Sequence, residues 1–267
     1  MRYAEAMDRS TRFTSKYRNY AALYDVVVAT LPASPTVVEI GIANGGSLQT
    51  WRTLLGPDAR IVGIDLNERS VAMRDEGFEV VVMDTGQALS WRELAEVVPE
   101  GIDLLVDDGG HTNRQQLSAI LYGIDLIRDG GWLVIEDLHA SFMREFGNPS
   151  PYSTARLLEQ LTSDLHRAHP RSSVPPRRPH LASSVEYVVT GTSWSALRIR
   201  RWTADAVAEV TAGSNATLMD YDHRWDATVG RRASRALPPW LRRVARGAYL
   251  RAAGMAEARS LFNRDTR

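Results

Sequence analysis

The stretch Val37-Val38-Glu39-Ile40-Gly41-Ile42-Ala43-Asn44-Gly45-Gly46-Ser47-Leu48 decides the fold. A short run rich in β-branched residues ends in an acid and enters a glycine-rich turn. After the turn, apolar residues recur at helical spacing as far as Leu55. A strand, a tight turn and a helix in this order open nucleotide-type pockets in doubly wound α/β folds. Glycine lets the backbone approach a ligand closely, and Ser47 is predicted to cap the helix.

The next strand of the unit is predicted over residues 59–66 and ends at Asp65. A carboxylate at this point commonly accepts both hydroxyls of a ribose. A glycine loop alone is weak evidence for such a pocket, and an acid roughly 20 residues later strengthens it.

Composition limits the class of protein. With 267 residues, 44% hydrophobic and 24% charged, the chain is long enough for one large domain with appendages. It has no run of about 18 apolar residues and no apolar signal core near Met1. The absence of cysteine excludes disulfides, thiolate metal sites and a cysteine nucleophile. We therefore expect a cytoplasmic protein.

Basic residues are distributed unevenly. Lys16 is the only lysine, which we attribute to a GC-rich coding bias. Residues 231–267 contain ten Arg against Glu257 and Asp265, a net charge of +8, so residues 1–230 carry −8. The predicted amphipathic helix over 239–262 is expected to pack on the acidic body or on another subunit of a homo-oligomer. Peripheral contact with an anionic membrane is the alternative.

The remaining pattern alternates between strands and helices. We predict an N-terminal helical segment (1–33), an α/β domain (34–202) and an Arg-rich helical extension (203–267). Further strands are predicted over 78–83, 102–106 and 132–135, with helices over 68–74, 89–98, 112–127 and 153–166. A hairpin over 184–190 and 195–201 turns at Gly191-Thr192, and the loop 169–179 is a candidate lid. This order predicts a doubly wound, mostly parallel, seven-stranded sheet that ends in an antiparallel hairpin, as in class I methyltransferases.

Three segments outside this core invite separate predictions. A helix over 10–31 precedes the first strand, and Ser15, Lys16 and Tyr17 are its candidates for contact with a ligand. A further helix is predicted over 203–211, followed by a polar and aromatic loop over 220–226 whose role stays open.

Acidic residues follow two strands that should be neighbours. The fourth strand leads into Asp107-Asp108-Gly109-Gly110-His111, and the fifth into Glu136-Asp137-Leu138-His139. The carboxylates of Asp108, Glu136 and Asp137 would converge at the ligand-binding edge. Such a group needs a cation or protonation, and oxygen ligands favour a hard ion such as Mg²⁺.

His111 is the candidate general base, because a neutral imidazole there can take a proton from a substrate hydroxyl. His139 is either a neighbour of the ligands or a loop residue. At the end of the third strand, Asp84 is either an acceptor for an adenine amine or a turn former.

These motifs together resemble the metal-dependent class I O-methyltransferases of the macrolide-sugar and rhamnosyl type, which also include cephalosporin hydroxylase-like enzymes. The resemblance covers about residues 13–202 and rests on Glu39-Ile40-Gly41, Gly45-Gly46-Ser47-Leu48, the strand ending at Asp65, and the two acidic motifs. It implies that Asp108, Glu136 and Asp137 hold the metal and that His111 is the base. It also implies an S-adenosylmethionine pocket, whose residues would be Glu39, Gly41, Gly45, Ser47, Asp65, Asp84 and Asp107.

The implied activity is S-adenosylmethionine-dependent and Mg²⁺-dependent methylation of a hydroxyl on a sugar-containing small molecule, a glycoside natural product or a glycolipid. Alternatives are a non-sugar acceptor, an NAD-dependent oxidoreductase, a nucleic-acid methyltransferase and a non-catalytic partner protein. The loop spacing and the hairpin count against an oxidoreductase. The acidic body counts against nucleic acid, and the complete set of carboxylates counts against loss of catalysis.

Overall fold

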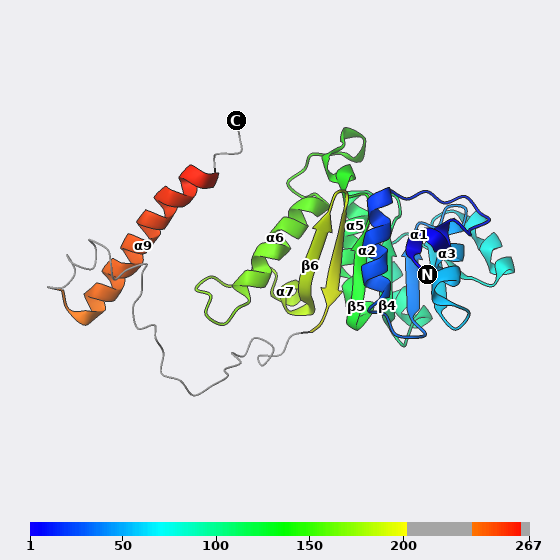
Figure 1. The fold of residues 1–267 in the computed structure, drawn as a ribbon, viewed down its shortest axis with the longest axis horizontal. Helices are drawn as coiled ribbons and strands as arrows, with labels where there is room; N and C mark the ends of the chain where they lie inside the picture. The colour runs from blue at the N-terminus through cyan, green and yellow to red at the C-terminus, as the bar shows by residue number, and fades with distance from the viewer. Residues whose placement is uncertain (202–236, 263–267) are drawn as a thin grey trace. The chain divides into compact units, whose positions relative to one another are not determined.

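A computed structural model of the chain describes residues 1–201 and 237–262 (Figure 1). The chain divides into two compact units, Met1–Ala208 and Glu209–Arg267. The predicted helix 203–211 and the loop 220–226 lie outside the described residues. None of the helices in the described part has the length and apolar character needed to cross a membrane.

A seven-stranded sheet forms the centre of the first unit (Figure 1). Its strand order is β3-β2-β1-β4-β5-β7-β6, and β7 runs antiparallel to both of its neighbours while the other pairs are parallel. The predicted mostly parallel sheet with an antiparallel hairpin is therefore confirmed. The strands are β1 Thr36–Ile40, β2 Arg60–Asp65, β3 Glu79–Val82, β4 Ile102–Asp107, β5 Ile127–Ile135, β6 Val185–Gly191 and β7 Trp194–Ile199.

Helices cover both faces of the sheet, and the alternation of side chains along β1 shows how. Val37 belongs to an apolar cluster with α1, α2 and α3, whereas Val38 belongs to a second cluster with α4, α5, α6 and α7. The helices described within residues 1–201 are α1 Tyr3–Met7, α2 Arg18–Val28, α3 Gly46–Leu55, α4 Ala88–Val97, α5 Asn113–Leu121, α6 Thr154–Arg167 and α7 Pro179–Ser184, with 3₁₀ turns η1 Glu68–Glu76, η2 Gly123–Leu126, η3 Leu138–Phe142 and η4 Arg144–Phe146.

The predicted helix over 10–31 is wrong in its first third. Residues 10–17 are not helical, and we call them the N-terminal strap; α2 begins only at Arg18. The strap is held by tertiary contacts instead: the Ser10 hydroxyl donates to the Gly46 carbonyl, and the Thr11 amide donates to the Gln49 side chain. The short helix α1 was not predicted.

The predicted start of a helix and the predicted start of a strand also need correction. Gly45, in a left-handed conformation, precedes the first residue of α3, so Ser47 lies inside the helix and is not its cap. The strand predicted over 132–135 is longer than expected: β5 begins at Ile127, includes residues 129–131 and pairs with β4 through a register shift. Gly130 adopts a φ of 83° within this irregular stretch.

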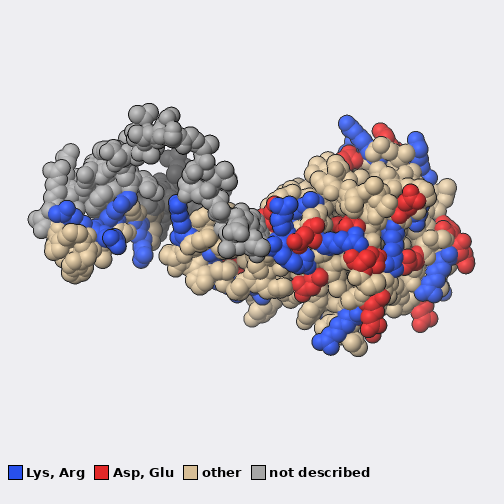
Figure 2. All heavy atoms as spheres, turned by 90° about the horizontal axis from the view of Figure 1, so that it is seen from below, with Lys and Arg blue, Asp and Glu red and all other residues tan. Residues whose placement is uncertain are grey.

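The second unit contains α9, Pro239–Phe262, which confirms the predicted helix over 239–262. Trp240 and Val244 are exposed on it. That α9 packs on the body, on another copy of the chain or on a membrane stays a prediction. On the face drawn in Figure 2, the first unit carries basic and acidic side chains interspersed.

The order of strands places the site. Chain order reverses between β1 and β4, and a sheet of this type binds ligands at the carboxyl end of such a switch point. Ile40 pairs with Asp107, and Asp107 pairs with Ile135. Gly41, Asp108 and Glu136 therefore leave three adjacent strands at the same level.

Candidate active site at the carboxyl edge of the sheet

The turn after β1 lies directly against the turn after β4. Gly41 has a φ of 84°, and a Cβ there would lie 2.2 Å from the carbonyl oxygen of Asp108. Only glycine allows both this backbone conformation and this approach. The loop that carries residues predicted to bind S-adenosylmethionine is thus in van der Waals contact with the loop that carries the predicted metal ligand Asp108.

Asp65 organises the glycine loop through its carboxylate. Oδ2 accepts from the amides of Ile42 at 3.1 Å and Ala43 at 3.2 Å, and Oδ1 accepts from the amide of Asn67 at 2.9 Å. Each carboxylate oxygen has further lone-pair capacity, so the group can fix the loop and still accept a ribose hydroxyl.

Glu39 is completely buried below this loop. Its Oε2 accepts from the indole N–H of Trp51 at 2.9 Å, and its Oε1 lies 3.5 Å from the ammonium of Lys16. Burial raises the pKa of Glu39, while Lys16 and the Ser47 and Trp51 hydrogen bonds oppose that effect. Glu39 therefore supports the loop from beneath, and its role in binding S-adenosylmethionine stays a prediction.

The other residues predicted to bind S-adenosylmethionine lie around the same loops. Gly45 precedes α3, and the Asp84 carboxylate accepts from the Gly86 amide at 2.9 Å in a turn. Asp107 is completely buried, with burial raising its pKa to about 7. Its Oδ2 has no hydrogen-bond partner within the described part of the protein. An orphaned oxygen of this kind suits a group that accepts from a bound ligand or carries a proton itself.

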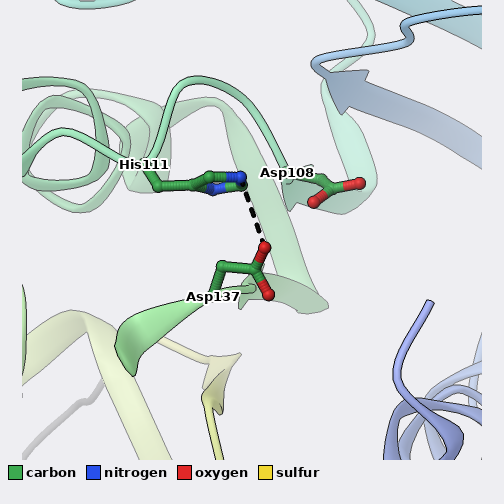
Figure 3. A group of neighbouring side chains, drawn as sticks. All are labelled: Asp108, His111 and Asp137. Carbon is green, nitrogen blue, oxygen red and sulfur yellow. Dashed lines mark ion pairs between the residues drawn. The ribbon is translucent and has the colours of Figure 1, made fainter. Parts of the chain in front are cut away.

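Asp108, His111 and Asp137 converge on the β4–β5 side (Figure 3). Their candidate ligand atoms all lie within 4.8 Å of one another, and His111 Nε2 is 3.3 Å from Asp137 Oδ2. Two carboxylates and an imidazole at this spacing are a donor set for a divalent cation.

A cavity of about 230 Å³ opens at this cluster, lined by Ser15, Lys16, Tyr17, Tyr20, Asp108, Glu136 and Asp137. All three predicted metal ligands thus face the same cavity.

Glu136 is oriented differently from the other two predicted ligands. It is buried, its Oε1 accepts from Lys16 at 2.8 Å, and the hydroxyl of Tyr24 donates to the same oxygen. Lys16 also lies 2.6 Å from Asp108 Oδ2. Burial raises the pKa of Glu136 and Lys16 opposes this, whereas the carboxylates around Lys16 outweigh its burial and raise the pKa of the ammonium.

Three supporting residues of this cluster were not predicted. Tyr20 donates to Asp137 Oδ1 at 2.7 Å, Tyr24 donates to Glu136, and the buried amide of Gln116 donates to the Glu136 carbonyl at 2.8 Å. The tyrosines recur at helical spacing on α2, a pattern that is typical of the apolar face of any packed helix. No sequence pattern singles out Gln116.

Backbone strain gathers at the same place. Within residues 1–201 and 237–262, the non-glycine residues with positive φ are Ala43, His111, Asp137 and Ser193. Ala43 belongs to the glycine loop, and His111 and Asp137 to the acidic cluster. Such conformations are held by the surrounding structure and are frequent at active sites.

A second cavity lies beside Asp137. It measures about 370 Å³, and its apolar lining includes Leu138, Phe142, Ala155 and Leu158. His139 and Ser193 also line it, and His139 Nδ1 is 2.5 Å from the Ser193 hydroxyl. Tyr20 joins the two cavities, because its hydroxyl contacts both Asp137 and Ser193. His139 therefore lines this second cavity, and its role stays open.

Comparison with known proteins agrees with this geometry. Residues 38–138 match a family described as a methyltransferase domain. The chain is 30% identical over 155 residues to the 8-demethyl-8-alpha-L-rhamnosyl tetracenomycin-C 2'-O-methyltransferase of Streptomyces olivaceus, covering 54% of this chain and 40% of that protein. It is 31% identical over 121 residues to the demethylmacrocin O-methyltransferase of Streptomyces fradiae, covering 43% and 30% respectively. The chain thus spans less than half the length of these relatives.

Solved structures show the same fold. The MycE methyltransferase of the mycinamycin biosynthetic pathway, in complex with Mg and SAH, aligns with a TM-score of 0.66 at 21% identity. The alignment covers 75% of this chain and 55% of MycE. The sheet order and its antiparallel end are those of the class I methyltransferase fold.

Proposed function

We propose that this chain, whose methyltransferase domain is similar to those of sugar O-methyltransferases, transfers a methyl group from S-adenosylmethionine to a hydroxyl of a glycoside in a divalent-cation-dependent reaction. The observation that carries the proposal is the contact at Gly41 between a nucleotide-type glycine loop and the loop that bears Asp108 and His111. That contact supports a pocket for S-adenosylmethionine next to the acidic cluster, at one switch point of the sheet.

The donor would bind over residues 41–46. Asp65 has the lone pairs to accept a ribose hydroxyl, and Asp84 lies at the next strand end for the adenine. The unpartnered oxygen of Asp107 is a further acceptor. S-adenosylmethionine supplies an electrophilic methyl group and would need nothing more from the protein than binding and alignment.

The residues of the acidic cluster fit a hard divalent cation. Asp108 and Asp137 present carboxylate oxygens next to His111, and Glu136 borders the same cavity. A bound Mg²⁺ would lower the pKa of an acceptor hydroxyl by its charge. The name of the relative from Streptomyces olivaceus includes a rhamnosyl group in its substrate. Two adjacent hydroxyls of a sugar would be a suitable chelating pair for the cation.

His111 is oriented for proton transfer. Asp137 fixes one ring nitrogen, while Nδ1 lacks a partner in the described part of the chain and can accept a proton. The contact with Asp137 holds the imidazole ring in one orientation. His111 would thus take the proton of the acceptor hydroxyl as the methyl group is transferred.

The apolar cavity beside Asp137 suits the part of the acceptor that carries the sugar. A volume of about 370 Å³ is within the range of small-molecule sites. We propose that the sugar faces Asp137 and that a hydrophobic aglycone or lipid lies against Phe142 and Leu158. His139 and Ser193 would contact the acceptor at the junction.

The proposal is tested in two stages. Calorimetry should detect binding of S-adenosylmethionine or its demethylated product to the protein alone. A panel of glycosides with apolar aglycones is then incubated with labelled methyl donor, and matched non-sugar alcohols serve as controls. EDTA should abolish the transfer and Mg²⁺ should restore it.

Each stage has an outcome that contradicts a different part of the proposal. Absence of donor binding would exclude the cofactor. Full turnover in EDTA would exclude the cation dependence while leaving the fold assignment intact. Transfer to non-sugar alcohols alone would identify a small-molecule O-methyltransferase of another substrate class.

A further inference from the structure

The ammonium of Lys16 occupies the place where a cation is needed. Its side chain is 4% exposed and contacts Asp108 at 2.6 Å, Glu136 at 2.8 Å and Glu39 at 3.5 Å. Two of these carboxylates are predicted metal ligands. The lysine reaches them from the N-terminal strap, 92 and 120 residues away along the chain.

Lys16 also accounts for the incomplete assembly of the predicted ligand set. Asp108, His111 and Asp137 offer ligand atoms within 4.8 Å of one another, but Glu136 is not part of that group. Its Oε1 is engaged by Lys16 and by Tyr24. Glu136 can join the other ligands only when it turns away from this ammonium.

A divalent cation bound at Asp108 and the ammonium of Lys16 would repel each other strongly. A divalent ion bound to Asp108 would lie within a few ångströms of an ammonium that contacts the same carboxylate. In a partly desolvated site this repulsion is large compared with ordinary surface electrostatics. Withdrawal of the ammonium relieves it and frees one oxygen each of Asp108 and Glu136.

We propose that Lys16 is a resident counter-ion that exchanges with the divalent cation at Asp108 and Glu136. Without the cation, Lys16 neutralises the acidic cluster. When the cation binds, the ammonium leaves and the N-terminal strap shifts with it. This inference rests on the proposed function only in assuming that the cluster binds a divalent cation.

The exchange would also affect the glycine loop, residues 41–46, over which S-adenosylmethionine is proposed to bind; we call it the donor loop. The strap lies on that loop, since a Cβ at Gly46 would be 2.6 Å from the Phe13 carbonyl oxygen and 2.7 Å from that of Arg12. Arg12 donates to the Asn44 carbonyl as well. Cation binding at one end of the strap is thereby coupled to the cover of the donor loop at the other.

Because Lys16 is the only lysine, the amino terminus is the only competing amine, and peptide analysis separates the two. The protein is treated with an amine-reactive acylating reagent in EDTA and in saturating Mg²⁺, without donor or acceptor, and Lys16 is followed by peptide mass spectrometry. Exchange predicts little acylation in EDTA and at least about tenfold faster acylation in Mg²⁺, a factor worth roughly 1.4 kcal/mol in exposure. An Arg92→Lys variant adds a reference lysine on the exposed face of α4, whose acylation should not respond to Mg²⁺.

Binding of Mn²⁺ provides a second measurement, read from the electron paramagnetic resonance of the free ion. Lys16→Met removes the competing charge at similar length and should bind Mn²⁺ at least about tenfold more tightly. Lys16→Arg keeps the charge and should bind no more tightly than the wild type. The wild-type acylation test stands even if Lys16→Met does not fold.

The outcomes separate this inference from the proposed function. If Mn²⁺ does not bind the wild-type protein, the cation dependence of the proposed function fails. If Mn²⁺ binds while Lys16 stays protected in saturating metal, or if Lys16→Met binds it more weakly, the exchange is wrong and the proposed function stands.

Discussion

On the β1–β2 side of the sheet edge, the Asp65 carboxylate accepts backbone N–H groups from the adjoining turns. On the β4–β5 side, Glu136 and Asp137 depend on side chains of α2 and the strap, namely Lys16, Tyr20 and Tyr24. The first arrangement is local and partly exposed. The second is long-range, and Glu136 within it is buried.

The difference follows from the number of charges that each side brings together. The Asp65 carboxylate stands apart from the other acids of the site and is satisfied by backbone amides of the turns. Several carboxylates in one desolvated cluster need positive charge or protons. The chain meets that need with a lysine from a distant segment, which makes the β4–β5 side sensitive to whatever moves the strap.

The largest loss of stability is expected from a substitution at Gly41, where the loop after β1 contacts the loop after β4. Gly41→Ala would place a Cβ 2.2 Å from the Asp108 carbonyl oxygen, with backbone atoms of Gly109 also too close. Backbone on both sides would have to move, and we expect the free energy of unfolding to fall by more than about 4 kcal/mol or the protein not to fold. Denaturant unfolding checks this.

Gly56→Ala is the matched control for that substitution. Its φ of 86° is nearly the same, but a Cβ there would meet nothing within 4 Å. Its ψ of −179° lies in a region that is essentially restricted to glycine, so we expect only this backbone strain, about 1–3 kcal/mol. Equal losses for both variants would show that the contact between the loops contributes nothing.

Removal of the imidazole should affect the β4–β5 side alone. His111→Ala is expected to lower the rate of methyl transfer by about 10²–10⁴, since it removes the proposed base. Donor affinity, measured by calorimetry, should stay within error, because the donor-side residues do not contact His111. A variant with unimpaired turnover would show that the proton leaves by another route.

The local side of the site could be predicted from sequence, and the long-range side only in part. Glu39, Gly41 and Asp65 belong to contiguous strand and turn motifs, so their placement follows from the pattern. Asp108, Glu136 and Asp137 were predicted to converge because neighbouring strands end together. Lys16 could be named as a candidate but not placed, because its partners lie 92 and 120 residues away.

The same limit explains the incorrect helix over 10–17. The strap has residues that a helix tolerates, but its contacts with Gly46 and Gln49 override that local preference. Gln116 illustrates the opposite case. Its side chain supports the Glu136 backbone from inside the core, where sequence gives no reason to expect a glutamine.

A moderate loss of affinity for S-adenosylmethionine is expected from a substitution at Asp65, on the β1–β2 side. Asp65→Ala should weaken donor binding by about 1.5–3 kcal/mol, because a charge-assisted hydrogen bond is lost. Thermal stability should fall as well, since three backbone amides lose their acceptor. Asp65→Asn keeps one acceptor oxygen and should be intermediate in both measurements. Unchanged donor affinity in Asp65→Ala would remove this residue from the pocket.

The smallest effect is expected at the exposed anchor of the strap. Arg12 Nε donates to Glu76 at 2.6 Å, and both side chains are about one-third exposed, at 38% and 32%. Solvent screens such a pair, so Glu76→Gln should lower the melting temperature far less than loss of the buried Lys16 contacts.

The pH dependence of that small effect identifies its origin. The Arg12 hydrogen bond, helped by Gln49, lowers the pKa of Glu76 in the folded state. A carboxyl group with a lowered folded pKa stabilises the protein above its ordinary pKa, and this contribution disappears as the pH falls through the lowered value. The melting temperatures of wild type and Glu76→Gln should therefore differ slightly at neutral pH and converge in acid. If the difference in melting temperature persists in acid, the effect comes from packing of the strap and not from the charge of Glu76.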